Sequence, residues 1–146
     1  KKKKIGKYIL LWVLSKIIQV FLKLNYILLQ NKSHLQGPEI FTALLDLLRA
    51  SHFQTTEPNE LFVLSQSCRL ITLLLDKDEL PAQIDTLIYV LSALFKNCEN
   101  AQVLYNICGS LYVISEGGYR YASAVISSGV VPRLTELLRW EVYLFI

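Results

Sequence analysis

Apolar residues recur every three or four positions through most of this chain, and glycines or prolines separate the apolar segments. This spacing places the apolar side chains on one face of a helix. It predicts helices over residues 38–49, 60–75 and 81–96, then a long helix from residue 101, a short helix and a final helix. No stretch alternates apolar and polar residues at the period of a strand. The chain is therefore expected to be all-α.

Glycine and proline mark where these helices are expected to end and begin. Gly117, Gly118 and Gly129 suit the left-handed residue that ends a helix. A first helical turn tolerates a residue without an N–H, because that group has no partner within the helix. Prolines stand at three such positions, namely Pro38, Pro81 and Pro132.

One leucine-rich pattern occurs three times, each time shortly after a proline. Its copies are Leu44-Leu47-Leu48, Leu87-Val90-Leu91 and Leu134-Leu137-Leu138, which are 43 and 47 residues apart. This period is typical of HEAT and armadillo repeats and predicts about two and a half repeats over residues 31–146. Because such repeats stabilise their neighbours, we expect this part of a chain to bury its faces fully only beside further repeats.

The segment Gly129 to Leu138, G-V-V-P-R-L-T-E-L-L, resembles the second helix of an armadillo repeat of the importin-α branch. Residues 108–117 are similar to the end of its third helix. The resemblance implies an α-solenoid of three-helix repeats and a non-enzymatic scaffold that binds nuclear localisation signals in an inner groove. It also implies a role in nuclear import and protein transport, in the cytoplasm or the nucleus.

In that family the third helix of each repeat carries a tryptophan and, four residues on, an asparagine, which hold the cargo peptide. Alignment on Cys68 and Cys108 places Arg69 and Leu73 at these positions in one repeat, and Gly109 and Val113 in the next. These side chains offer no indole face for a lysine and no amide for an extended backbone. Arg69 would also repel a basic peptide. The family's cargo ladder is therefore predicted to be degenerate here.

The four aligned residues remain candidates for a peptide-binding face, together with Tyr105 and Tyr112. The alternative for the tyrosines is a position half buried in the core. Gly109 costs its helix about 1 kcal/mol relative to alanine. It is explained either by a close packing contact with a neighbouring helix or by the approach of a bound chain.

Residues 1–30 form a separate, basic and strongly apolar segment, for which three interpretations remain open. A transmembrane helix is marginal, because Lys16 and Lys23 cost about as much as the apolar residues gain. A helix at a membrane surface would place Tyr8 and Trp12 near the headgroups and both lysines on its polar stripe. The third interpretation is a long apolar helix packed against the repeats. The alternative function is accordingly a helical-repeat protein anchored to a membrane by this segment.

The apolar segment and the degenerate ladder together are similar to the family called transmembrane and coiled-coil domain-containing protein six. That family combines degenerate armadillo repeats with strongly apolar segments.

Charge and composition narrow the function further. Hydrophobic residues make up 53% of the chain and charged residues 18%, which excludes wholesale disorder. Residues 1–32 hold eight lysines and no acid, whereas the remaining seven lysines and arginines face twelve acids, a net charge of −5. Nucleic acid is therefore not expected as a partner of residues 33–146. A protein or peptide is the expected partner.

No constellation of catalytic residues stands out in the sequence. The three cysteines lack C-x-x-C spacing and are predicted to be reduced thiols of the core, while His34 and His52 have no ligand partners nearby. We therefore expect no enzyme activity, no metal, no cofactor and no small-molecule substrate.

Overall fold

The computed structural model describes residues 38–50 and 57–144. Within these ranges the chain forms six helices and no strand, which confirms the all-α prediction. The helices are α2 (Pro38–Ala50), α3 (Pro58–Leu74), α4 (Ile84–Asn97), α5 (Ala101–Glu116), α6 (Tyr119–Ser127) and α7 (Val130–Leu144). No helix in this part of the chain is both long and apolar enough to cross a membrane. The apolar segment 1–30, with Tyr8, Trp12, Lys16 and Lys23, lies outside the described residues.

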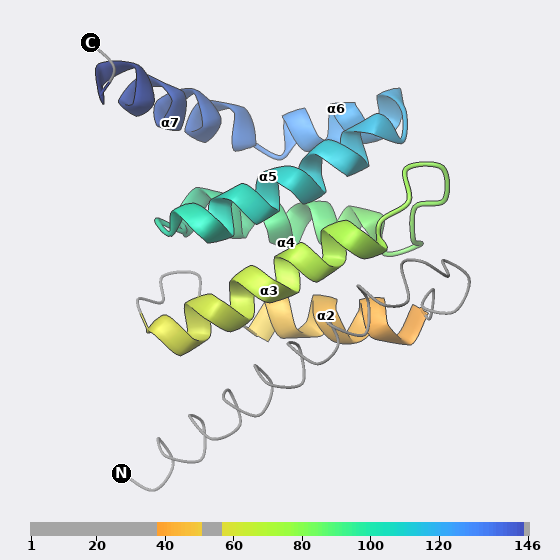
Figure 1. The fold of residues 1–146 in the computed structure, drawn as a ribbon. Coiled ribbons are helices and arrows are strands. Elements are labelled where there is room, and N and C mark those ends of the chain that lie inside the picture. Colours follow the sequence, from red (N-terminus) through yellow and green to blue (C-terminus); the bar gives the residue numbers. More distant parts are fainter. Residues whose placement is uncertain (1–37, 51–56, 145–146) are drawn as a thin grey trace, which may run out of the picture.

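The helices form two rows (Figure 1). In one row α2 contacts α4, and α4 contacts α7, while α3 and α5 pack side by side in the other. The rows are joined by contacts of α2 with α3 and of α4 with α5. The short α6 contacts α4, α5 and α7. Along the molecule the helices follow one another in chain order, with α2 and α7 at opposite ends (Figure 1).

The core lies where the rows meet, and the leucine-rich pattern explains two of its layers. Leu44 and Leu48 of α2 are buried, as are Leu87 and Leu91 of α4. The equivalent residues of α7 remain open, with Leu134 40% and Leu138 56% exposed. The difference between α4 and α7 follows from position, because α4 contacts both α2 and α7, whereas α7 contacts only α4 and α6 among the described helices.

The start of α4 differs from the sequence prediction, whereas the start of α5 agrees with it. We predicted that Pro81 begins a helix, but α4 begins three residues later at Ile84. The Ile84 amide donates to the Pro81 carbonyl at 3.0 Å, so residues 81–84 form a turn that leads into the helix. α5 starts at Ala101 because the Asn100 side chain accepts a hydrogen bond from the Val103 amide at 3.1 Å and caps the helix.

The glycines between α5 and α6 have separate roles. Gly118 has φ 127° and ψ 171°, a conformation that only glycine adopts readily. Gly117 has φ −68°, so the prediction of a left-handed residue is wrong for this position. Gly117 is instead needed for close packing, since an added Cβ would lie 2.6 Å from Leu80 Cδ1 and 3.2 Å from the Lys77 carbonyl oxygen. Between α6 and α7, Gly129 also has a positive φ, 83°.

Candidate functional site

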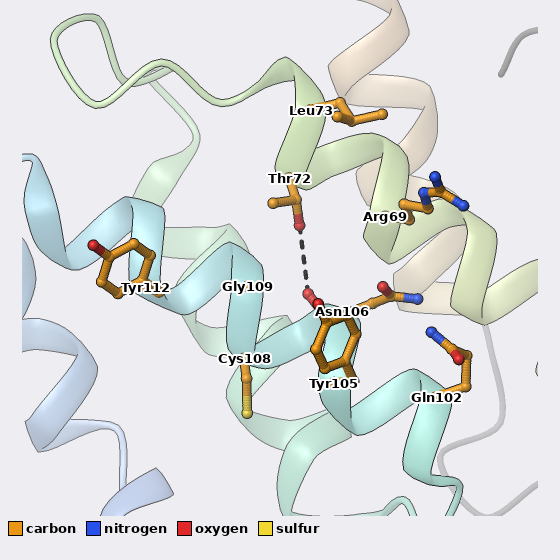
Figure 2. A pocket seen from close by; sticks show the side chains of 9 residues that line it. All are labelled: Arg69, Thr72, Leu73, Gln102, Tyr105, Asn106, Cys108, Gly109 and Tyr112. Carbon is orange, nitrogen blue, oxygen red and sulfur yellow. Dashed lines mark hydrogen bonds between the residues drawn. The ribbon is translucent and has the colours of Figure 1, made fainter. Parts of the chain in front are cut away.

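A groove of about 550 Å³ lies along α3 and α5. α3 provides one wall and α5 provides the floor and the other wall (Figure 2). The lining residues are Arg69, Thr72, Leu73, Gln102, Tyr105, Asn106, Cys108, Gly109 and Tyr112. The groove is thus built from two helices that follow one another in the same row.

Small side chains bring these two helices together beneath the groove. The Thr72 and Ser110 hydroxyl oxygens are 2.6 Å apart and share a hydrogen bond between α3 and α5. The Thr72 hydroxyl also donates to the Cys68 carbonyl of its own helix at 3.0 Å. Next to this pair is Gly109, where an added Cβ would lie 3.6 Å from Thr72 Cγ2. The groove is open at this point because residue 109 has no side chain to fill it.

Asn106 is a buried polar residue at the edge of this floor. Its amide nitrogen donates to Ser65 Oγ at 2.9 Å and to the Ser65 carbonyl oxygen at 3.1 Å. Buried amides are usually satisfied in this way, because an unpaired polar group is costly. With the nitrogen engaged by α3, the amide oxygen is the acceptor that Asn106 offers to a ligand in the groove.

The two tyrosines of the α5 wall are exposed, and they differ in the hydrogen bonding of their hydroxyl groups. Tyr105 is 75% exposed and Tyr112 is 62% exposed, so neither is half buried in the core. The Tyr112 hydroxyl donates to Glu116 Oε1 at 2.9 Å. This hydrogen bond and the charge of Glu116 raise the pKa of the Tyr112 hydroxyl. The Tyr112 hydroxyl is thus held by the Glu116 carboxylate at one end of the groove. The exposed ring of Tyr105 can contact a ligand.

The α3 wall carries Arg69 and, one turn on, Leu73, and both side chains are exposed (Figure 2). Arg69 makes no ion pair with a carboxylate of the described residues. Other arginines are paired: Arg120 with Asp85 at 3.1 Å, and Arg133 with Glu99 at 3.0 Å. Within residues 38–50 and 57–144, no acidic side chain lines the groove. Arg69 thus supplies a positive charge that the carboxylates of the described part of the chain leave unpaired.

The structure brings together five of the six residues that the sequence singled out on α3 and α5, namely Arg69, Leu73, Tyr105, Gly109 and Tyr112. Val113 does not line the groove, because it turns inward and packs against the core. The prediction missed Thr72, Gln102, Asn106 and Cys108. Periodicity held a signal for two of them, since Gln102, Asn106 and Gly109 follow one another at four- and three-residue steps.

The thiols near the groove are poor nucleophiles. Cys108 borders the groove, and burial raises the pKa of its thiol. Cys68 is fully buried, and burial, with a smaller effect of nearby Cys98, raises the pKa of Cys68 to about 12. Both side chains are therefore thiols at neutral pH, and the thiolate is the reactive form. The groove offers hydrogen bonding, an aromatic face and one cation.

No protein-family model matches this chain, and neither a curated protein nor a solved structure matches it. The resemblance to armadillo repeats therefore depends on the residues quoted above. The geometry of the groove on α3 and α5 is the independent basis for a functional proposal.

Proposed function

We propose that this chain is a non-enzymatic armadillo-type scaffold, related to nuclear-import adaptors, that binds an extended peptide or protein segment along α3 and α5. The observation that carries the proposal is the groove with Asn106, Tyr105 and Arg69 around its floor. A side-chain acceptor for the peptide's N–H groups, an aromatic face and a charge are the groups that hold an extended peptide and select its side chains.

The two rows of helices support the repeat interpretation. In this interpretation α2 and α3 belong to one repeat, α4 and α5 belong to the next, and α6 and α7 belong to a third. The helices with the leucine-rich pattern contact one another in succession, as second helices of stacked repeats would. Contact of each unit with the next is what stabilises a solenoid.

The groove changes which residues of this chain are matched to the family's tryptophan and asparagine. The family pattern is a tryptophan followed four residues later by an asparagine, and Gln102 and Asn106 have this spacing on the groove side of α5. Asn106 accordingly takes the role of the amide that binds the peptide backbone. Gln102 stands where the indole would be, and Tyr105 provides the nearest aromatic face in the groove. The previous assignment to Gly109 and Val113 followed from aligning the cysteines.

Selection from a library of random octapeptides displayed on phage tests this function, followed by fluorescence polarisation with the selected peptides. The sharpest comparison is Tyr105→Ala against Tyr89→Ala, because both tyrosines are 75% exposed and Tyr89 lies on α4, outside the groove. We expect Tyr105→Ala to weaken binding about tenfold, since exposed aromatic residues often dominate peptide contacts. Tyr89→Ala should bind like the unaltered chain.

Failure to select any peptide, or equal losses in both variants, would contradict the proposal. A separate arm uses a basic nuclear localisation signal and a scrambled copy of it. Binding of the intact signal alone, lost on raising the salt concentration, would favour the unchanged cargo class of the import adaptors.

A further inference from the structure

We propose that the groove selects an extended peptide with an aspartate or glutamate side chain placed against Arg69. This inference rests on the proposed function and names the chemistry of its partner. The charge of the preferred peptide is thus opposite to that of a nuclear localisation signal.

The unpaired charge of Arg69 is the first observation. Arg69 lines the groove from α3 and has no carboxylate partner among the described residues. Lysine and arginine side chains of a peptide would be repelled at this point. A carboxylate would form charge-assisted hydrogen bonds with the guanidinium, and two parallel bonds are the usual geometry of such a pair.

The composition of the rest of the lining is the second observation. Among the described residues that line the groove, Arg69 is the only charged one, and there is no second arginine or lysine. A phosphate carries about two charges and is commonly held by clustered arginines, whereas one guanidinium matches one carboxylate. At the other end, Glu116 holds the Tyr112 hydroxyl and disfavours a second acidic residue there.

The neighbours of Arg69 define the adjoining position. Leu73 lies one turn further on the same wall, and Tyr105 stands on the opposite wall (Figure 2). Side chains two residues apart on an extended chain point the same way. The preferred peptide should therefore carry an apolar residue two positions from its acidic residue.

The test repeats the octapeptide selection on the 146-residue chain and on Arg69→Glu, with Arg139→Glu as the control. Arg139 is an exposed arginine of α7 outside the groove, so its substitution makes the same charge change elsewhere. Circular dichroism and thermal melting check that the three proteins are equally folded.

We expect the unaltered chain and Arg139→Glu to enrich peptides with aspartate or glutamate at one position. Arg69→Glu should enrich lysine or arginine at that same position. For an individual selected peptide, Arg69→Gln should weaken binding about tenfold or more, and Arg69→Lys should weaken it less. Replacing the acidic residue of that peptide by its amide should weaken binding to a similar degree.

Peptides that depend on Tyr105 but not on Arg69 would overturn this inference and leave the proposed function standing. Enrichment of basic residues by the unaltered chain would also overturn it. In a further arm the acidic residue is replaced by phosphoserine, and tighter binding of that peptide would show that phosphate is the preferred group. Absence of any selected peptide would overturn the proposed function itself.

Discussion

The amide nitrogen of Asn106 lies 2.9 Å from Ser65 Oγ and 3.1 Å from the Ser65 carbonyl oxygen, which joins α5 to α3 beneath the groove. Both residues are buried. The contact sets how far one helix is shifted along the other and fixes the orientation of the Asn106 side chain. A residue of the proposed binding surface is therefore also part of the helix interface.

Asn106→Ala should lower the free energy of unfolding by about 1–3 kcal/mol, because it leaves the buried Ser65 hydroxyl without its partner. Ser65→Ala should cost less. In urea denaturation of both single variants and the double variant, we expect a coupling energy of at least about 0.5 kcal/mol. Strictly additive effects would mean that the two residues contribute to stability independently.

Gly109→Ala should raise the free energy of unfolding by about 0.5–1 kcal/mol. The residue has a helical conformation, and the added methyl group would meet Thr72 Cγ2 at an ordinary contact distance of 3.6 Å. Thermal melting of the unaltered chain and the variant measures the difference. A lower melting temperature would indicate that α3 and α5 are closer than the structure has them.

Gly118→Ala should lower the free energy of unfolding by about 1–3 kcal/mol, although no atom lies within 4 Å of the added Cβ. The cost comes from the backbone, since φ 127° with ψ 171° is nearly closed to other residues. Gly118→Asn is the informative control, because asparagine tolerates the left-handed helical region but not this one. Rescue by asparagine in urea denaturation would contradict the conformation of Gly118.

The stability of the chain should fall as the pH rises above about 9. In the unfolded chain the Cys68 thiol ionises near its ordinary pKa, whereas burial raises the pKa of Cys68 in the folded chain to about 12. Between these values the folded state holds one more proton, so its advantage decreases by about 1.4 kcal/mol per pH unit.

Urea denaturation at pH 8 and pH 10.5 measures this effect, with Cys68→Ala as the control. The variant should be less stable at pH 8, because alanine leaves a cavity at a fully buried position. Its stability should fall less steeply between the two pH values. Equal slopes for both proteins would rule out a buried, protonated thiol at residue 68.

Local features of the sequence were sufficient for the helices of the described residues. Apolar residues at three- and four-residue steps predicted α2, α3 and α5 to within a few residues, because helix periodicity is a local property. The prediction that Pro81 begins a helix was wrong because it, too, used local sequence alone. The residue is compatible with a first helical turn, but a turn at residues 81–84 precedes α4.

The sequence by itself determined that the described part of this chain is helical and, through steps of four and three residues, that Tyr105, Gly109 and Tyr112 share one face of α5. Tertiary structure decided that Asn106 faces the groove and that Val113 packs into the core. The rotation of α5 against α3 follows from contacts between residues about 40 positions apart, such as Thr72 with Ser110. A single helix carries no information about this rotation, because each of its faces becomes inner or outer only when a neighbour packs against it.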